Sequence, residues 1–365
     1  MAKVGLAYDL IDLNFIDGSP LDTLAEFDTK ETIMAISRAL EAGGHEVIPL
    51  EADEKFVDKL TGSRPDIVFN LVEGHRGECR ESQVPAICEF FNIPYTGSGV
   101  LTLALCLNKA LTNQFLHSQG ILVPPYQVFE TPNEDIHLEN DYPLIVKLLH
   151  EGSSMGLSRK SVVKNEIALR EQIAYVIETY QQPAMAQKYI IGREFTIGVL
   201  GNQDPYTLPI TEVKFDDPYG IVTFCPDDEV FPLLEDRFGR EFVQDLKQKL
   251  IPKKSMCPAD VSHELAGRIV QTAIRAFKVL GCRDWCRVDM RIAEDGSIYV
   301  LELNPIAGIA PGYWLPNSAE VAHLDYSAFI NTILEIAWAR IHANQSGLHL
   351  PNRAGVEGEA AFEEG

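Results

Sequence analysis

Residues 285–304 read WCRVDMRI, AEDG and SIYVLELN, so two runs of alternating polar and apolar residues flank a turn ending in Asp-Gly. This pattern predicts an antiparallel β-hairpin closed by the segment 293–296. Closure of the turn fixes which residues lie opposite one another on the two strands. The expected cross-strand pairs are Ile292 with Ser297, Asp289 with Val300, Arg287 with Glu302, and Trp285 with Asn304.

Side chains alternate between the faces of a strand, so the hairpin should have one apolar and one polar face. The polar face carries Arg287, Asp289, Glu302 and Asn304. Carboxylate and amide oxygens suit Mg²⁺ held between a protein and phosphate groups, so we expect a metal site. A solvated face is the alternative, but the glycine-bearing loop 305–312 can offer N–H groups to an anion and favours the metal site. The apolar face, expected in the core, consists of Val288, Met290, Ile292, Tyr299, Leu301 and Leu303.

A second candidate site follows a strand predicted at 144–149. This strand carries Lys147 and leads into EGSSMG at 151–156, whose small residues let the backbone approach phosphate oxygens. The spacing differs from GxxxxGK[ST], so the usual P-loop fold is not indicated, and a plain flexible turn is the alternative. Lys147 and Lys188 favour an anion site because burying an ammonium group on an apolar strand without an anion is costly.

The rest of the chain alternates short apolar runs with helical patterns, which is typical of a parallel α/β unit followed by a second unit. Strands of an open parallel sheet bind ligands at their carboxyl ends, so the loop 72–82 is a candidate substrate loop. A capping pattern at 28–31 begins the first helix. The expected strands are 3–8, 46–50, 66–71, 184–189 and 194–200, and the expected helices include 103–119, 166–180, 262–280 and 326–341.

The bulk composition limits the partners. The net formal charge of −22 at pH 7 argues against nucleic-acid binding, and an anionic ligand would need locally concentrated lysine and arginine. No apolar run approaches the ~20 residues that span a bilayer, and no signal-peptide pattern is present. We therefore expect a cytoplasmic protein that does not enter the membrane.

Together these motifs resemble those of the D-alanine–D-alanine ligases, a family of the ATP-grasp superfamily. The resemblance extends in order over residues 66–340. The segments that carry it are IPYTGSGVLTLALCLNKALT (93–112), PLIVK (143–147), EGSSMG (151–156), QKYIIGREFTIGVLG (187–201), CPA (257–259), and LGCRDWCRVDMRI through GSIYVLELNPIAG (280–308).

The resemblance implies an α/β fold in which an N-terminal Rossmann-like, parallel-sheet domain precedes a two-lobed ATP-grasp, with the nucleotide between the lobes. We expect the N-terminal domain at 1–105 and the central lobe at 106–190. The C-terminal lobe would occupy 191–345 and include a lid at 211–257, whose composition is irregular and charged. A flexible tail would follow at 346–365.

The family's residue roles carry over onto matching positions of this chain. ATP would be bound by Lys109, Lys147, Ser154, Gln187, Lys188, Tyr189 and Glu194. Two Mg²⁺ ions, with Mn²⁺ as an alternative ion, would be held by Asp289, Glu302 and Asn304. The catalytic groups would be Arg287 and the Gly308 N–H, which stabilise a tetrahedral intermediate, together with Ser153, the first serine of the 151–156 loop.

Departures from the family pattern lie on the substrate side. The early GGxSxE signature is absent from 7–10 and 25–28, and the histidine of LHGxxGE is replaced by Glu73. The lid tyrosine that bonds the first loop serine, Ser153 here, has no clear counterpart, and the NTSPGM loop reads NPIAGI at 304–309. The ATP half of the pattern is thus intact, whereas the substrate half is rewritten.

We expect the first substrate's pocket in the loops after the first and third strands, with Glu73 and Glu78 or Arg80 replacing the family's usual contacts. A carboxylate in place of histidine favours a substrate with an ammonium group or several hydroxyls. A surface pairing of Glu73 with His75 or Arg76 is the alternative.

The chemistry implied is phosphorylation of a carboxylate by ATP, attack of an amine on the acyl phosphate, and loss of phosphate. We expect small-molecule amino-acid and acid substrates and a homodimer. Three functions stay open: a ligase that joins D-alanines, a ligase that joins an amino acid to another acceptor such as a mycosporine-type ring, and a non-catalytic nucleotide-binding relative. The acidic metal set disfavours the third, because a non-catalytic relative does not need it.

Overall fold

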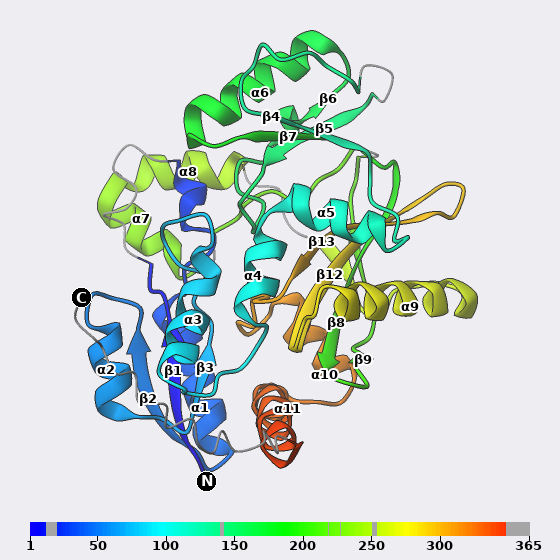
Figure 1. Cartoon of the computed structure of the whole chain (residues 1–365). Coiled ribbons are helices and arrows are strands. Elements are labelled where there is room, and N and C mark those ends of the chain that lie inside the picture. The colour runs from blue at the N-terminus through cyan, green and yellow to red at the C-terminus, as the bar shows by residue number, and fades with distance from the viewer. Residues whose placement is uncertain (12–19, 139–141, 218, 227, 250–253, 348–365) are drawn as a thin grey trace, which may run out of the picture.

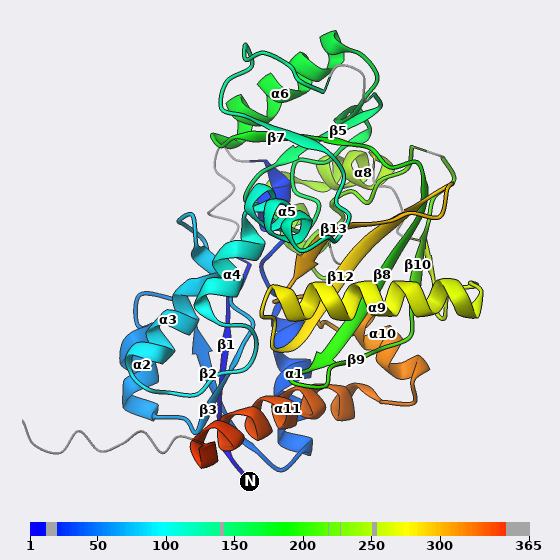
Figure 2. The same cartoon turned by 45° about the vertical axis from the view of Figure 1, so that its right-hand side comes forward.

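The structure contains three sheets joined and covered by helices (Figures 1 and 2). The strand order is β2-β1-β3 in the N-terminal sheet, β4-β7-β5-β6 in the middle sheet and β11-β10-β8-β12-β13 in the large sheet, where β9 also pairs with β8. The first sheet is parallel and the other two are antiparallel, which confirms the expected fold class. The computed structural model describes the whole chain except for residues 12–19, 139–141, 218, 227, 250–253 and 348–365.

The N-terminal sheet is covered on both faces, because alternate side chains of its central strand are apolar in both directions. Leu6 packs towards one pair of helices, α1 and α11, and Ala7 packs towards another pair, α2 and α3. The cap of α1 lies one residue beyond the predicted Asp28, since the Thr29 hydroxyl accepts the Thr32 N–H at 3.2 Å. The elements are β1 (Lys3–Tyr8), α1 (Lys30–Ala42), β2 (Glu46–Glu51), α2 (Phe56–Ser63), β3 (Ile67–Asn70), α3 (Gln83–Phe90) and α11 (Tyr326–Gly347).

The single helix predicted at 103–119 is divided into α4 (Val100–Leu107) and α5 (Lys109–Ser118). Asn108 leaves the helical conformation with ψ of 101°, and its side chain accepts the Leu111 N–H at 3.0 Å. The asparagine thus ends one helix and caps the next. As a result Lys109 becomes the first residue of α5, where its N–H bonds the Leu149 carbonyl at 3.1 Å.

The middle sheet matches its predicted elements closely. Its helix α6 (Glu166–Tyr180) has the bounds that the sequence predicted, and Asn165 caps it by accepting the Ala168 N–H at 3.0 Å. Apolar side chains of α6 pack on one face of the sheet, and the opposite face turns towards the large sheet. The strands are β4 (Tyr126–Phe129), β5 (Leu144–Leu148), β6 (Val162–Val163) and β7 (Ala184–Lys188).

The large sheet carries α9 (His263–Val279) across one face (Figure 2). Ile269, Ala273 and Phe277 of this helix belong to the same core as the apolar side chains of β12 and β13, in agreement with the helical period in the sequence. The strands are β8 (Gly192–Gly201), β9 (Tyr206–Thr207), β10 (Thr211–Lys214), β11 (Lys254–Met256), β12 (Asp284–Ala293) and β13 (Ile298–Asn304), and α10 (Trp314–Val321) follows them.

The segment 211–257, whose composition is irregular, nevertheless contains regular structure. This segment contains β10 and β11 and, between them, α7 (Val230–Phe238) and α8 (Arg240–Lys249). The helices form because apolar side chains of α7, including Phe231 and Leu234, pack with Val243 of α8 and with Leu24 of η2 (Leu21–Leu24). The acidic composition of the segment concealed this apolar stripe.

The predicted register of the β12–β13 hairpin was also wrong, although its polar face was correct. Gly296 has φ of +81°, and the Ala293 N–H bonds the Ser297 carbonyl at 2.9 Å, so the loop is one residue shorter than predicted. Ile292 therefore faces Ile298, and further along an irregularity at Leu301 shifts the pairing so that Asp289 faces Glu302. The shift returns Glu302 and Asn304 to the polar face, whereas Tyr299 and Leu301 leave the core face that the sequence assigned them.

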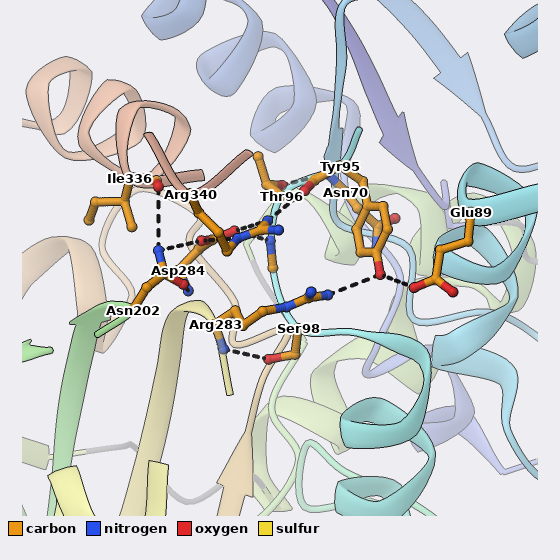
Figure 3. Close-up of polar contacts among 11 residues, drawn as sticks. Asn70, Glu89, Tyr95, Thr96, Ser98, Asn202, Arg283, Asp284, Ile336 and Arg340 are labelled. Carbon is orange, nitrogen blue, oxygen red and sulfur yellow. Dashed lines mark hydrogen bonds and ion pairs between the residues drawn. The ribbon is translucent and has the colours of Figure 1, made fainter. Parts of the chain in front are cut away.

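The large sheet is joined to the N-terminal unit through Asp284, the fully buried first residue of β12 (Figure 3). Its carboxylate accepts hydrogen bonds from the Gly97 N–H at 2.7 Å, from Asn202 at 3.0 Å and from Arg340 of α11 at 2.8 and 3.0 Å. Arg340 also donates to the Tyr95 carbonyl at 2.9 Å. Next to this cluster Trp285 stacks on Phe69 of β3, with ring centroids 6.0 Å apart.

We expect Arg340→Met to lower the free energy of unfolding by about 3 kcal/mol, because it leaves the buried Asp284 carboxylate without its cation. In a chain of this size that loss corresponds to a fall in Tm of roughly 5 °C, measurable by calorimetry. Arg38→Met, an exposed change on α1, is the matched control. Equal Tm values for the two variants would contradict the role of the Arg340–Asp284 pair.

Candidate functional site

Two neighbouring cavities lie where the middle sheet faces the large sheet, and we name them the Lys147 cavity and the Glu73 cavity. They share the residues Lys109, Glu151, Gly152, Arg287 and Glu302. The Lys147 cavity is also lined by Ile145, Lys147, Ser154, Gln187, Lys188, Tyr189, Glu194, Ile221, Val222, Asp289, Arg291 and Leu301. The Glu73 cavity is also lined by Glu73, Glu81, Cys106, Ser153, Asn304, Ala307 and Gly308. The sequence-predicted site residues thus meet here, except for Glu78 and Arg80.

The polar face of the hairpin forms the boundary between the cavities. Arg287 donates to the Asp289 carboxylate from Nε at 3.0 Å and from Nη2 at 2.8 Å, and the Thr196 hydroxyl bonds the same group at 2.6 Å. Asn304 Nδ2 lies 3.2 Å from Asp289 Oδ2, and Glu302 shares a hydrogen bond with Asp289. Burial raises the pKa of Asp289. Burial also opposes ionisation of Glu302, but the charges of Lys109, Lys147 and Arg287 outweigh it and lower the pKa of Glu302.

Among the described residues, Lys147 carries an ammonium group without a bonding partner. It projects from β5 into its cavity, and within the described ranges its ammonium group forms no hydrogen bond or ion pair. Burial lowers the pKa of Lys147 to about 8. By contrast, Lys109 already donates to the Glu151 carbonyl. An anion entering this cavity would therefore satisfy a charge that the protein leaves unpaired.

Part of the lining of the Lys147 cavity is apolar. Ile145 and Leu301 line it, and the buried Gln187 side chain presents an Nε2 group without a hydrogen-bond partner among the described residues. A flat heteroaromatic ring with an acceptor nitrogen fits such a lining. Glu194 lies nearby but is engaged by Arg291 at 2.7 Å, an ion pair that the sequence did not predict.

The loop 151–156 is held at both ends by carboxylates of the N-terminal segment. Glu26 accepts the Gly152 N–H at 2.8 Å, and Asp22 of η2 accepts the Gly156 N–H at 2.7 Å. Asp22 also accepts the hydroxyl of Tyr180, the last residue of α6, at 2.8 Å. The loop is thereby fixed over the cavities by groups far away in the sequence.

Between these anchors Ser153 and Ser154 adopt positive φ angles of 48° and 62°. In the part of the chain that the structure describes, their N–H and hydroxyl groups have no hydrogen-bond partner. Successive N–H groups that are free of internal bonds are suited to an anion. The anion-binding loop that the sequence suggests stays a prediction, and these unbonded groups are compatible with it.

Arg80 and Glu78 do not occupy the predicted substrate positions. Arg80 is buried, pairs with Glu26 and with Glu151 at 2.8 Å, and donates to the His150 carbonyl at 2.9 Å. Arg80 therefore links Glu26 to Glu151 of the 151–156 loop and does not line either cavity. Glu78 is exposed and lines neither cavity.

Glu73 lines the cavity named after it, so the alternative of a surface pair with His75 or Arg76 is wrong. His75 instead lies 3.8 Å from the Asp9 carboxylate and stacks on Phe27. Glu81, three residues after Glu78, lines the same cavity and was not predicted. The sequence offered one signal for it, the run of acidic and basic residues at 78–81 in the candidate substrate loop.

Asp22, Glu26 and Arg291 are further site residues that the sequence reasoning missed. Their partners lie on other elements, and no local pattern marks them. Groups of three or more histidine, cysteine, aspartate or glutamate residues that could hold a metal are absent from the described residues. A metal site therefore depends on the mixed set Asp289, Glu302 and Asn304. None of the helices that the structure describes is long and apolar enough to span a membrane.

Known proteins include relatives of this chain. A family model described as the D-ala D-ala ligase C-terminus matches residues 115–335. A D-alanine–D-alanine ligase of Syntrophobacter fumaroxidans is 31% identical over 302 residues, which cover 80% of this chain and 84% of that protein. An uncharacterized protein of Sinorhizobium fredii is 29% identical over 318 residues, which cover 85% of this chain and 88% of that protein.

The fold is likewise similar to a solved structure. The D-alanine–D-alanine ligase of Bacillus anthracis, crystallised with ATP, has a TM-score of 0.70 at 21% identity, and the match covers 94% of this chain and 100% of that chain. The likeness extends over the N-terminal parallel sheet and the two antiparallel sheets of this chain. The chain therefore belongs to the D-alanine–D-alanine ligase family and is a ligase with the ATP-grasp fold.

Proposed function

We propose that this ligase uses ATP and Mg²⁺ to activate a carboxylate as an acyl phosphate, which an amine then attacks. The observation that carries the proposal is the unpaired Lys147 ammonium in a cavity that adjoins a second cavity through Lys109, Arg287 and Glu302. A nucleotide in the first cavity would direct its terminal phosphate to this shared wall. A carboxylate in the second cavity would meet it there.

The nucleotide would lie with its base against Gln187 and Tyr189 and its phosphates against Lys109 and Lys147. The free N–H groups of the 151–156 loop, at Ser153 and Ser154, would donate to phosphate oxygens. Glu194 would bond the ribose. In this proposal the lobes 106–190 and 191–345 enclose the nucleotide, and the N-terminal domain, residues 1–105, supplies the wall of the Glu73 cavity.

The residues present fit a magnesium site. The buried Asp289 and the half-buried Glu302 share a hydrogen bond, an arrangement that a cation stabilises, and Asn304 adds an amide oxygen. We propose that these three residues hold two Mg²⁺ ions, which would neutralise the charge of the transferred phosphate. Mn²⁺ has the same ligand preference and would serve as an alternative ion.

The groups that would assist the transfer are Arg287 and the Gly308 N–H, both of which line the Glu73 cavity. When the amine attacks the acyl phosphate, negative charge develops on the former carboxyl oxygen. Fixed N–H donors beside that oxygen lower the barrier, because they need no reorientation during the reaction. The amine must lose a proton before or during attack, and phosphate leaves with its bonding electrons.

We base the proposed substrate class on the name of a relative. The relative from Syntrophobacter fumaroxidans is named a D-alanine–D-alanine ligase, and we propose small amino-acid and acid substrates for this chain. The segment 211–257 would act as a lid: α7 and α8 pack on η2, which carries Asp22, so ordering of this segment would be coupled to the 151–156 loop.

We expect Glu302→Gln to lower ATP-dependent phosphate release at least a hundredfold, because loss of a metal ligand removes several kcal/mol of charge stabilisation. Release would be measured with saturating ATP, Mg²⁺ and a mixture of amino acids. Glu294→Gln, an exposed change in the turn of the same hairpin, is the control and should retain full activity. Turnover of Glu302→Gln within threefold of the unmodified enzyme would refute the metal assignment.

We expect Asp22→Ala to raise the KM for ATP about tenfold, since the loop loses a charge-assisted anchor at Gly156. Asp22→Asn should show a smaller effect because its amide oxygen can still accept the N–H. The exposed change Asp204→Ala is the control. A uniform loss of kcat with the KM for ATP unchanged would indicate a general structural role instead of positioning of the loop.

A further inference from the structure

The Glu73 cavity contains two carboxyl groups that the protein leaves without partners. Both Glu73 and Glu81 line it, and Glu81 is buried, with 9% of its surface exposed. Across the described portion of the chain, neither carboxyl forms a hydrogen bond or an ion pair. Buried polar groups in proteins are almost always bonded, so an unbonded pair that faces a cavity points to a ligand.

The surroundings of this pair are short of positive charge. Glu26 and Glu151 lie close to Glu81, but Arg80 already binds both of them. The charge of Lys109 favours the ionised form of Glu81, although the Lys109 ammonium group donates its hydrogen bond to the Glu151 carbonyl. Acidic groups therefore outnumber the cations around the pair, and a ligand with positive charge would restore the balance.

We propose that Glu73 and Glu81 form a subsite for a protonated nitrogen of the substrate, separate from the amine that attacks. The inference rests on the proposed function, because it assigns the orientation of a substrate in the cavity where the carboxylate is activated. The attacking amine has to be neutral, so a nitrogen held by two carboxyls is a recognition group and not the nucleophile. The substrate class is an amino acid, with its α-ammonium group or a side-chain ammonium group at this pair.

The protonation of the empty cavity agrees with this assignment. Burial, followed by the charge of Glu26, raises the pKa of Glu81 to about 8, and burial raises the pKa of Glu73 well above its usual value. The Glu81 carboxyl is then largely protonated at neutral pH until a cation replaces its proton, and the pKa of Glu73 is shifted in the same direction. For Glu73 the neighbouring charges are Glu26, Glu81, Arg80 and Asp28, and for Glu81 they are Glu26, Arg80, Lys109 and Glu151.

A raised carboxyl pKa has a definite effect on stability. Its contribution is fully present below the unfolded pKa of about 4.5 and is lost as pH rises through about 8. Glu81→Gln removes this ionisation, so its Tm should exceed that of the unmodified protein by a margin that grows from pH 5 to pH 8. A carboxylate with a structural role would give the opposite result, a lower Tm after substitution.

Substrate selection is tested with two pairs of probes, each as both enantiomers. Alanine and lactate differ in the α-ammonium group, and ornithine and norvaline differ in the distal one. In ATP-dependent phosphate release with one fixed amine as the second substrate, the member of at least one pair that carries the additional ammonium group should have a kcat/KM at least tenfold above that of its partner. Glu73→Gln and Glu81→Gln should remove most of this advantage and leave the KM for ATP unchanged. Glu171→Gln, an exposed change on α6, is the matched control.

Binding without turnover separates this inference from the proposed function. With a non-hydrolysable ATP analogue and Mg²⁺, the probe with the additional ammonium group should raise the Tm of the unmodified protein more than its partner does, and this difference should vanish in Glu81→Gln. Selective binding without any phosphate release would refute the ligase proposal and retain the subsite. Equal responses to the two members of both pairs, or no response to any probe with the additional ammonium group, would overturn the subsite.

Discussion

The pairing of β12 with β8 on one side and β13 on the other is the constraint on which the molecule depends. All residues of β12, from Asp284 to Ala293, pair with β8, so the strand cannot shift without breaking the whole ladder. Asp284 at its start binds the N-terminal unit and α11, whereas Arg287 and Asp289 in its middle face the cavities. One rigid strand therefore fixes the distance between the N-terminal sheet, which supplies Glu73, and the charged face on which the reaction depends.

The second constraint is the burial of charge in a protein whose net charge is −22. Burying a cation in such a protein requires a local counter-charge, and most cations of the site have one: Arg287 binds Asp289, and Arg291 binds Glu194. Lys109 donates only to a backbone carbonyl, whereas Lys147 has neither an ion pair nor a hydrogen bond within the described residues, and its lowered pKa expresses the cost. The site is thus preorganised for an anion with little rearrangement, because one charge is kept available while the others remain paired.

Sequence alone predicted what depends on local pattern. The alternation of polar and apolar residues located the strands, and the helical period located α6 and α9. The predicted polar face of the hairpin was correct although its register was wrong, because the irregularity at Leu301 restored the alternation. What depends on contacts between distant segments was missed. Arg80 was assigned to substrate because its partners, Glu26 and Glu151, are far from it in the chain. The helices of 211–257 were missed for the same reason, since their apolar stripe packs on η2.

The two cavities are opposite in electrostatic character, and this difference has a consequence for the reaction. The Lys147 cavity has an unpaired cation, and the Glu73 cavity has unpaired carboxyls, while Arg287 and Lys109 lie on the wall between them. In the resulting field an amino acid has one favourable orientation, with its carboxylate towards the shared wall and its ammonium group towards Glu73 and Glu81. That orientation places the carboxylate, and not the nitrogen, next to the position of the terminal phosphate. Charge separation across a few side chains would therefore select which end of the substrate is phosphorylated, before any bond changes.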